Sequence, residues 1–338
     1  MSTDQQPALK RKRADSSSSS EETPRSADTT RSDLWYDDGN VILQAESMQF
    51  KVHKSILAEN SSVFKDMFAF PQPPSTEAQL VEGCPVVRVS DSAEEMGYVL
   101  QELCQRKHRR YGVSLPLTIL SAFLCIGQKY DIQDLYVDAQ KMIFTGAPAT
   151  LHDHDALISL PTGPAAFYFR VDRSAPCRPD WYYGLQLVLL ARRTGLLSIL
   201  AFGLYYSSVR CTPEHIMDGT VLDDETIVSL AIQDQLACFV GYRAMLDAQA
   251  DTTYAWLHDD NFGAAHCTTP GRCKTTRQRY IIDKFTHKQR VTGLRPWIDI
   301  GPLRLCVECN KDAQVAHEAG QAEFWDKIPG LFGLPPWT

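Results

Sequence analysis

Four cysteines near the end of the sequence have the residue type and spacing of a metal site. Cys306 and Cys309 form a Cys-x-x-Cys pair, which lets two thiolates face one ion across a tight turn. Cys267 and Cys273 form a second pair with a Pro-Gly turn between them. Four thiolates at about 2.3 Å from one ion would complete a tetrahedral structural zinc site. Such a site is closed, so its chemistry would be structural and not catalytic.

The spacing of these cysteines leaves alternatives open. Five residues separate Cys267 from Cys273 and 32 separate the two pairs, both wider than in most small zinc motifs. His258 and His266 are alternative ligands for one position. The thiols could instead be small buried side chains, or a redox pair that lacks the strand–helix–strand context of thioredoxin-like motifs. Structural zinc, core packing and redox chemistry therefore all remain open at this point.

The rest of the sequence lacks the common signatures of catalysis. It contains no Gly-rich phosphate loop, no Gly-x-Ser-x-Gly elbow and no His-Glu-x-x-His motif. The His-Asp-His-Asp string at residues 152–155 places its histidines two apart, which is a poor chelate, and we interpret it as a linker or helix start. We expect a protein that is not an enzyme.

The elements that must position the cysteines are predicted to be helices. Apolar residues at helical spacing predict a helix pair broken at Gly195, and Pro213 begins another helix. The acidic residues 223–225 predict the start of a further helix, whose core-facing residues would include Ile227, Leu230, Leu236, Phe239 and Val240. Pro and Gly after Glu323 predict an irregular segment that docks its Trp and Leu side chains onto these helices. Arg192 and Arg193 interrupt the longest apolar run, which argues against a membrane span.

The N-terminal part shows a different pattern. Alternating residues at 41–43 and 50–52 predict two short strands of a hairpin. A 3.6-residue period then predicts short helices, with Ser61 or Ser62 as an N-cap. The apolar stripe of these helices comprises Ile56, Leu57, Val63, Phe64, Met67 and Phe68.

This stretch, with Val52-His53-Lys54 followed by Leu57, Ser62, Phe64 and Met67-Phe68, resembles the opening of a BTB/POZ domain. Residues 86–89 resemble the third strand of that family, 91–103 the helix after it, and 120–135 its helical hairpin with a Lys-Tyr-Asp turn. The resemblance covers roughly residues 32–145 and implies an α+β fold, a small sheet capped by helices. The later layout also resembles a group of fungal BTB proteins with a helical, cysteine-containing C-terminal region.

The resemblance implies a protein–protein interaction module that binds other proteins or a second copy of itself as a homodimer. In some BTB domains an apolar-x-Glu pattern engages a cullin ubiquitin-ligase scaffold, and Leu80 and Glu82 match it; Phe64 and Met67 complete the expected interaction residues. The protein would be an oligomerising scaffold or a substrate adaptor of a cullin-type ligase. A third alternative is a zinc-stabilised nucleic-acid-binding regulator, which would use Arg272, Lys274, Arg277, Arg279, Lys284 and Lys288 on phosphates.

Composition favours the interaction classes. A formal net charge of −7 makes nucleic acid an unfavourable partner. Scattered cysteines without the apolar core of a signal peptide predict a reducing, intracellular compartment, cytoplasmic and/or nuclear. The basic run at residues 10–13 is either a nuclear signal or a solvated tail. We expect a disordered tail (1–31), the BTB/POZ-like domain (32–148), a mostly α-helical region (149–257) and a cysteine-containing region packed on it (258–338).

Overall fold

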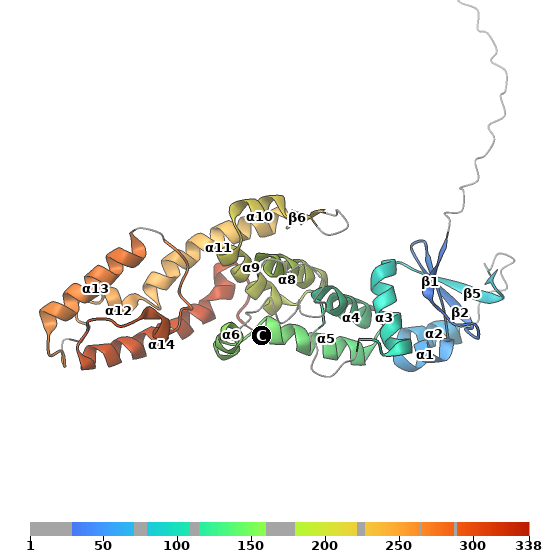
Figure 1. Cartoon of the computed structure of the whole chain (residues 1–338), viewed down its shortest axis with the longest axis horizontal. Helices are drawn as coiled ribbons and strands as arrows, with labels where there is room; N and C mark the ends of the chain where they lie inside the picture. The colour runs from blue at the N-terminus through green and yellow to red at the C-terminus, as the bar shows by residue number, and fades with distance from the viewer. Residues whose placement is uncertain are drawn as a thin grey trace, which may run out of the picture.

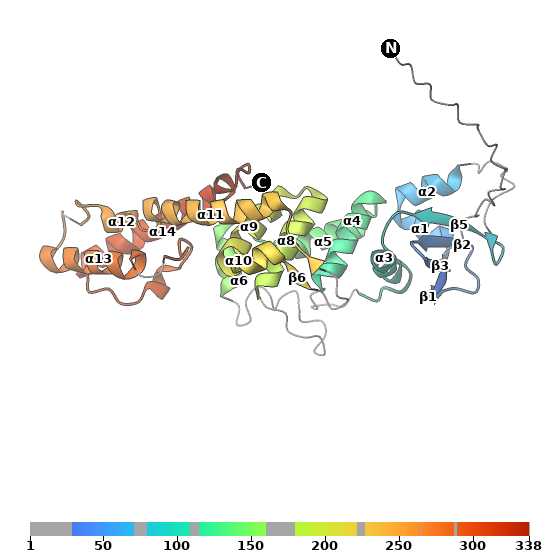
Figure 2. The same ribbon diagram turned by 90° about the horizontal axis from the view of Figure 1, so that it is seen from above.

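The computed structural model describes residues 29–70, 80–108, 115–159, 180–221, 227–263, 265–286 and 289–337. The basic run at residues 10–13 and almost all of the expected tail lie outside this range. The described part of the chain is elongated (Figure 1), with a small sheet at one end, α4 to α9 in the middle and α11 to α14 at the other end. Figure 2 shows the same order from above.

The sheet has five strands in the order β1-β3-β2-β5-β4. Strands β2 (Val41–Ala45) and β3 (Met48–Val52) form the predicted antiparallel hairpin, and β5 (Cys84–Val89) adds parallel to β2. Strand β4 (Leu80–Val81) pairs antiparallel with β5 at the edge of the sheet. The sequence reading missed β1 (Thr30–Trp35), which pairs parallel with β3 and begins before residue 32. The residues of β1 are largely polar and do not alternate clearly between polar and apolar, so the strand is recognised only from its pairing with β3.

Five helices complete the first domain, and the one at Ala93–Gln105 packs directly on the sheet. They are α1 (Lys54–Asn60), α2 (Ser62–Ala69), α3 (Ala93–Gln105), α4 (Leu117–Lys129) and α5 (Gln133–Gly146), which confirms the predicted helices. Ser61 is the N-cap of α2, since its hydroxyl accepts from the Phe64 N–H at 3.0 Å. Ser92 caps α3 in the same way, with Glu94 and Glu95 in the first turn.

The buried Ser61 hydroxyl also donates to the Tyr130 carbonyl at 2.5 Å, which ties α2 to the turn after α4. Ser61→Ala should therefore lower the free energy of unfolding by about 2 kcal/mol, because a cap is lost and a buried carbonyl loses its donor. The exposed neighbour supplies the control: Ser62→Ala should cost no more than about 0.5 kcal/mol. Equal costs for the two variants in urea unfolding would contradict this assignment.

The central region is helical, as predicted. It contains α6 (Leu151–Ile158), α8 (Asp180–Thr194), α9 (Leu197–Arg210), α10 (Pro213–Asp218) and α11 (Ile232–Asp251). Gly195 joins α8 to α9 with φ +75°, a left-handed conformation that favours glycine. The 152–155 string lies in α6, whose N-terminus is capped by Thr150, so it is the start of a helix. No helix in the described ranges is both long enough and apolar enough to span a membrane.

Two details of the sequence prediction around α11 were wrong. Ile227–Val228 is a strand, β7, which pairs antiparallel with β6 (Thr220–Val221), and α11 begins only at Ile232. Asp223, Asp224 and Glu225 lie outside the described residues. The apolar residues Leu236, Phe239 and Val240 are exposed, because α11 turns its other side to the interior and buries Asp234, Cys238, Gly241, Met245 and Gln249 there.

The distal end consists of α12 (Ala255–His258), α13 (Pro270–Phe285), a 3-10 turn (Trp297–Ile300) and α14 (Val307–Leu331). The prediction of an irregular segment after Glu323 was wrong as far as Leu331, since α14 continues through Pro329. A proline removes the hydrogen bond to the carbonyl four residues earlier, which is that of Trp325. The indole N–H of Trp337 donates to that carbonyl at 2.9 Å. The helix therefore tolerates the proline because the chain end folds back on it.

The chain end makes aromatic contacts with α14 and α6. The buried Trp325 ring stacks on Trp337 with centroids 4.7 Å apart, and its other neighbour is the buried His154 of α6 at 5.3 Å. The end of the chain is therefore held on the helical region.

Candidate metal centre and interaction surfaces

The structure brings the four predicted cysteines together. The sulfurs of Cys267, Cys273, Cys306 and Cys309 all lie within 4.8 Å of one another. Cys267 Sγ and Cys306 Sγ are 3.9 Å apart, close to the edge of about 3.8 Å that a tetrahedron of 2.3 Å bonds requires. A disulfide needs about 2.05 Å, and none of the four cysteines forms one. These separations are compatible with four sulfurs around one metal ion.

Two helix starts and one glycine position the sulfurs. Cys306 is the N-cap of α14 and Cys309 lies in its first turn, while Cys273 lies in the first turn of α13. The Cys267 N–H donates to the Gly263 carbonyl at 2.9 Å. Gly263 has φ +73°, and a Cβ there would lie 2.7 Å from Cys309 Sγ, so this position requires glycine. The sequence analysis did not predict a role for Gly263. The one indication in the sequence is that this glycine lies four residues before the first cysteine.

The thiols of the cluster differ in how readily they ionise. Backbone N–H groups, first that of Cys309, lower the pKa of Cys306 to about 5. Burial raises the pKa of Cys309, as does the proximity of the other thiols, and burial also raises the pKa of Cys267. Four thiolates at this separation repel one another, so they can all ionise only if a cation compensates their charge.

The predicted alternative ligands are not part of the cluster. In the described ranges no other group of three or more His, Cys, Asp or Glu residues has metal-site geometry, and this group contains neither His258 nor His266. The ring of His258 lies beside Phe285, with centroids 6.0 Å apart.

A small aromatic core beside the cysteines is separate from the main core. Its buried members are Tyr254, Trp256, Leu257, Tyr280 and Ala313. So few residues bury little apolar surface, and small cores of this kind usually need a metal or disulfide to be stable. The cysteine cluster lies beside this core, where a bound metal ion would supply such a constraint.

Of the basic residues predicted to contact phosphates, Arg277 is taken up by contacts within the chain, whereas Arg272, Lys274 and Arg279 are exposed. Arg277 is buried and donates to the carbonyls of Trp256, at 3.0 Å, and Asp259. Lys274 lies 3.8 Å from the Asp260 carboxylate, and Lys288 lies outside the described residues. Arg277 therefore holds α12 to α13, and the nucleic-acid interpretation loses its central cation.

The predicted interaction residues of the first domain differ in exposure. Leu80, on edge strand β4, is 61% exposed, whereas Phe64 is 1% exposed and stacks on Tyr130 at 4.7 Å. Met67 is partly buried against the main core. Of these three residues, Leu80 offers the most surface to a partner.

Glu82 has partners within the chain. Its carboxylate lies 2.7 Å from Arg31 Nη2 and 3.1 Å from the Nζ of the buried Lys51. The hydrogen bond from Lys51 is the main reason that the pKa of Glu82 is lowered. Glu82 thus links β1 and β3 to the β4–β5 turn. The sequence reading missed this network because its members are far apart in the chain.

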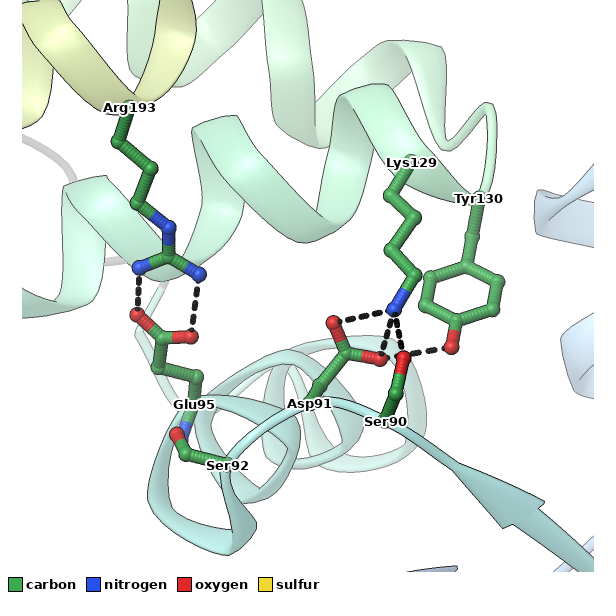
Figure 3. A network of polar contacts seen from close by, with 7 residues as sticks. All are labelled: Ser90, Asp91, Ser92, Glu95, Lys129, Tyr130 and Arg193. Atoms are coloured by element: carbon green, nitrogen blue, oxygen red, sulfur yellow. Dashed lines mark hydrogen bonds and ion pairs between the residues drawn. The ribbon is translucent and has the colours of Figure 1, made fainter.

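Two separate sets of polar contacts lie where α3 and α4 meet α8 (Figure 3); the first is within the first domain, and the second joins it to the helical region. Lys129 Nζ donates to both oxygens of Asp91 at 2.8 Å, and the Tyr130 hydroxyl donates to the same carboxylate at 2.7 Å. Arg193, from α8, makes a two-pronged ion pair with Glu95, from the first turn of α3, with one contact at 2.7 Å. Because α4 also packs against α8, the two regions meet along an apolar and a charged contact.

The Glu95–Arg193 pair should contribute measurably to stability. A double-mutant cycle with Glu95→Gln and Arg193→Gln should give a coupling energy of about 1 kcal/mol, since bidentate Arg–carboxylate pairs exceed ordinary surface pairs. The same cycle at Glu323 and Lys327, an exposed i,i+4 pair on α14, should give no more than about 0.5 kcal/mol. Coupling at the first pair no larger than at the second would refute a stabilising role for the junction.

Comparison with known proteins agrees with this fold. Residues 36–86 match the family model of the BTB/POZ domain. No curated protein matches the sequence of this chain. The matched residues contain the β2–β3 hairpin, α1, α2 and the start of β5, in the order and packing described above. The chain therefore carries a BTB/POZ domain, a protein–protein interaction module, followed by a mostly helical region.

Proposed function

We propose that this protein is a non-enzymatic scaffold that binds proteins through its BTB domain, including a second copy of itself, and that a structural zinc ion holds its distal helices together. The BTB/POZ match carries the first part of the proposal. The four converging sulfurs carry the second. An intracellular location, cytoplasmic or nuclear, belongs to the proposal because thiolates persist in a reducing compartment.

Native mass spectrometry of the full chain tests both parts in one measurement. We expect a dimer with one zinc ion per chain. Mass and metal content are read separately, so a zinc-bound monomer would overturn self-association alone, and a metal-free dimer would overturn the zinc site alone.

A substrate adaptor of a cullin-type ligase is the second candidate, which the exposure of Leu80 favours. In that case Leu80→Asp should abolish co-purification of a cullin while leaving the thermal unfolding midpoint almost unchanged. Glu82→Ala is the less informative variant: it should lower the midpoint because the buried Lys51 loses its carboxylate partner. A cullin that remains bound to the Leu80→Asp variant would rule out Leu80 as the contact, and the absence of any cullin would leave the scaffold.

A further inference from the structure

The exposed face of α11 carries adjacent large apolar side chains. Ile232 is 83% exposed, Leu236 60%, Phe239 39% and Val240 56%. Their positions are i, i+4, i+7 and i+8, so they form one stripe along the helix. The opposite face already packs on α9 and α14. This helix is therefore apolar on a side that the described part of the chain leaves exposed, which in soluble proteins marks a binding surface.

Helix α10 extends this surface. Met217 of α10 is also exposed, and the side-chain amide of Gln235 donates to the carbonyls of Met217, at 3.4 Å, and Leu230, at 2.9 Å. These bonds hold α10 beside the start of α11, where both lie in Figure 1. The stripe on α11 and Met217 are here called the α11 face. Its length and spacing suit a second amphipathic helix laid against it.

The surroundings of the α11 face are strongly acidic. The described residues between 211 and 251 include five acidic residues and one arginine, a formal net charge of −4. Asp234 is buried and paired with Arg192 of α8, so it does not contribute to the surface, but Glu214 and Asp218 are exposed on α10. This charge repels nucleic acids and anionic membranes, and it would also oppose the pairing of two such faces from two copies.

We infer that the α11 face binds an amphipathic α-helix of a partner protein, with an apolar stripe flanked by lysine and arginine. The basic segments of the chain itself do not fit this description. Residues 10–13 are followed by a run of serines and not by an apolar stripe. Helix α13 is basic, but its apolar side already packs in the distal core through Tyr280. The inference concerns the helical region and is independent of the BTB-mediated contacts.

Fluorescence anisotropy with two labelled model peptides tests this inference on the full chain. Both are amphipathic helices with the same leucine stripe; one carries lysine on its polar face and the other glutamate. The lysine peptide should bind and the glutamate peptide should not. Leu236→Asp should weaken lysine-peptide binding about tenfold or more, because a leucine contact is lost. Ile298→Asp, at an exposed isoleucine of the 3-10 turn, should leave the affinity unchanged.

The Leu236→Asp variant distinguishes apolar docking from simple attraction of charge. It adds a negative charge, so a purely electrostatic contact would hold the cationic peptide at least as tightly as before, and that result would overturn the inference. A fall in the thermal midpoint of this variant well beyond that of Ile298→Asp would show that the chain itself covers the face. A dimer that dissociates in Leu236→Asp but not in Ile298→Asp would show that a second copy covers it. Either outcome would also overturn the inference.

Discussion

Cys309→Ser is expected to abolish stoichiometric zinc binding and to unfold the distal end of the molecule while the BTB domain stays folded. The distal core is small, so the ion and not apolar burial would supply most of its stability. Structural zinc sites in small domains contribute on the order of 10 kcal/mol, and domains that depend on them unfold without metal. The part of the main core formed by β2, β3 and α4 lies toward the opposite end of the molecule from α12 and α13 (Figure 1), and its amides should keep their protection from exchange.

Hydrogen–deuterium exchange measures this separation. Amides of α12, α13 and the start of α14 should exchange much faster in Cys309→Ser, and likewise in the wild-type chain treated with a zinc chelator. Cys104→Ser, at a partly buried cysteine of α3 outside the cluster, is the matched control. This variant should still bind zinc, and its distal amides should stay protected from exchange. If chelation leaves the distal amides as protected as before, the cysteines act only as packing residues.

Gly320→Ala is expected to cause the largest loss of stability among the glycine substitutions in α14. A Cβ at this position would lie 2.6 Å from the carbonyl carbon of Thr252 and 2.7 Å from the Cα of Thr253. These are backbone atoms, so no side-chain rotation relieves the overlap, and α14 would have to move away from the start of α12. The hydrogen bond from Thr253 Oγ1 to the Gly320 carbonyl, at 3.3 Å, would be lost as well. We expect a cost of about 3 kcal/mol or more.

The same helix supplies the control. A Cβ at Gly330 meets nothing within 4 Å, so Gly330→Ala should stabilise the protein by about 0.4–1 kcal/mol through the lower entropy of the unfolded chain. Both values are measurable by urea unfolding. Opposite signs for two Gly→Ala changes in one helix would establish the close approach of α14 to residues 252–253; similar values would argue against it.

The sequence determined the elements whose signals are local. The β2–β3 hairpin, a cap at Ser61 or Ser62 and the break at Gly195 were predicted, because strand alternation, cap hydrogen bonds and left-handed turns depend on residues within a few positions of each other. The Cys-x-x-Cys pair was recognisable for the same reason. Together with the second pair it pointed to four cysteines, which the structure brings together, but it left their chemistry open.

Only the tertiary structure decided which side of each helix faces the core. An apolar stripe predicts burial if some other element covers it, and the sequence does not say whether one does. On α11 the stripe containing Leu236 is exposed, while the side that contains Asp234 is buried. The Asp234 carboxylate can be buried because Arg192 from α8 compensates its charge. In the sequence, Arg277 of α13 resembles a phosphate ligand. In the structure its side chain is buried and donates hydrogen bonds to two backbone carbonyls, one from α12 and one from the residue after it.

The convergence of the cysteines has the same origin. Cys273 and Cys306 are distant in sequence, and the Cys306 N–H reaches Cys273 Sγ at 3.2 Å only because α13 and α14 begin side by side. Pro329 likewise predicts the end of a helix from the sequence alone. The helix continues because the Trp337 indole N–H donates to the Trp325 carbonyl, which lacks its helical hydrogen bond. In each case the residue that decides the local structure is distant in the sequence. Its contribution to the free energy of folding appears only when the two segments come together.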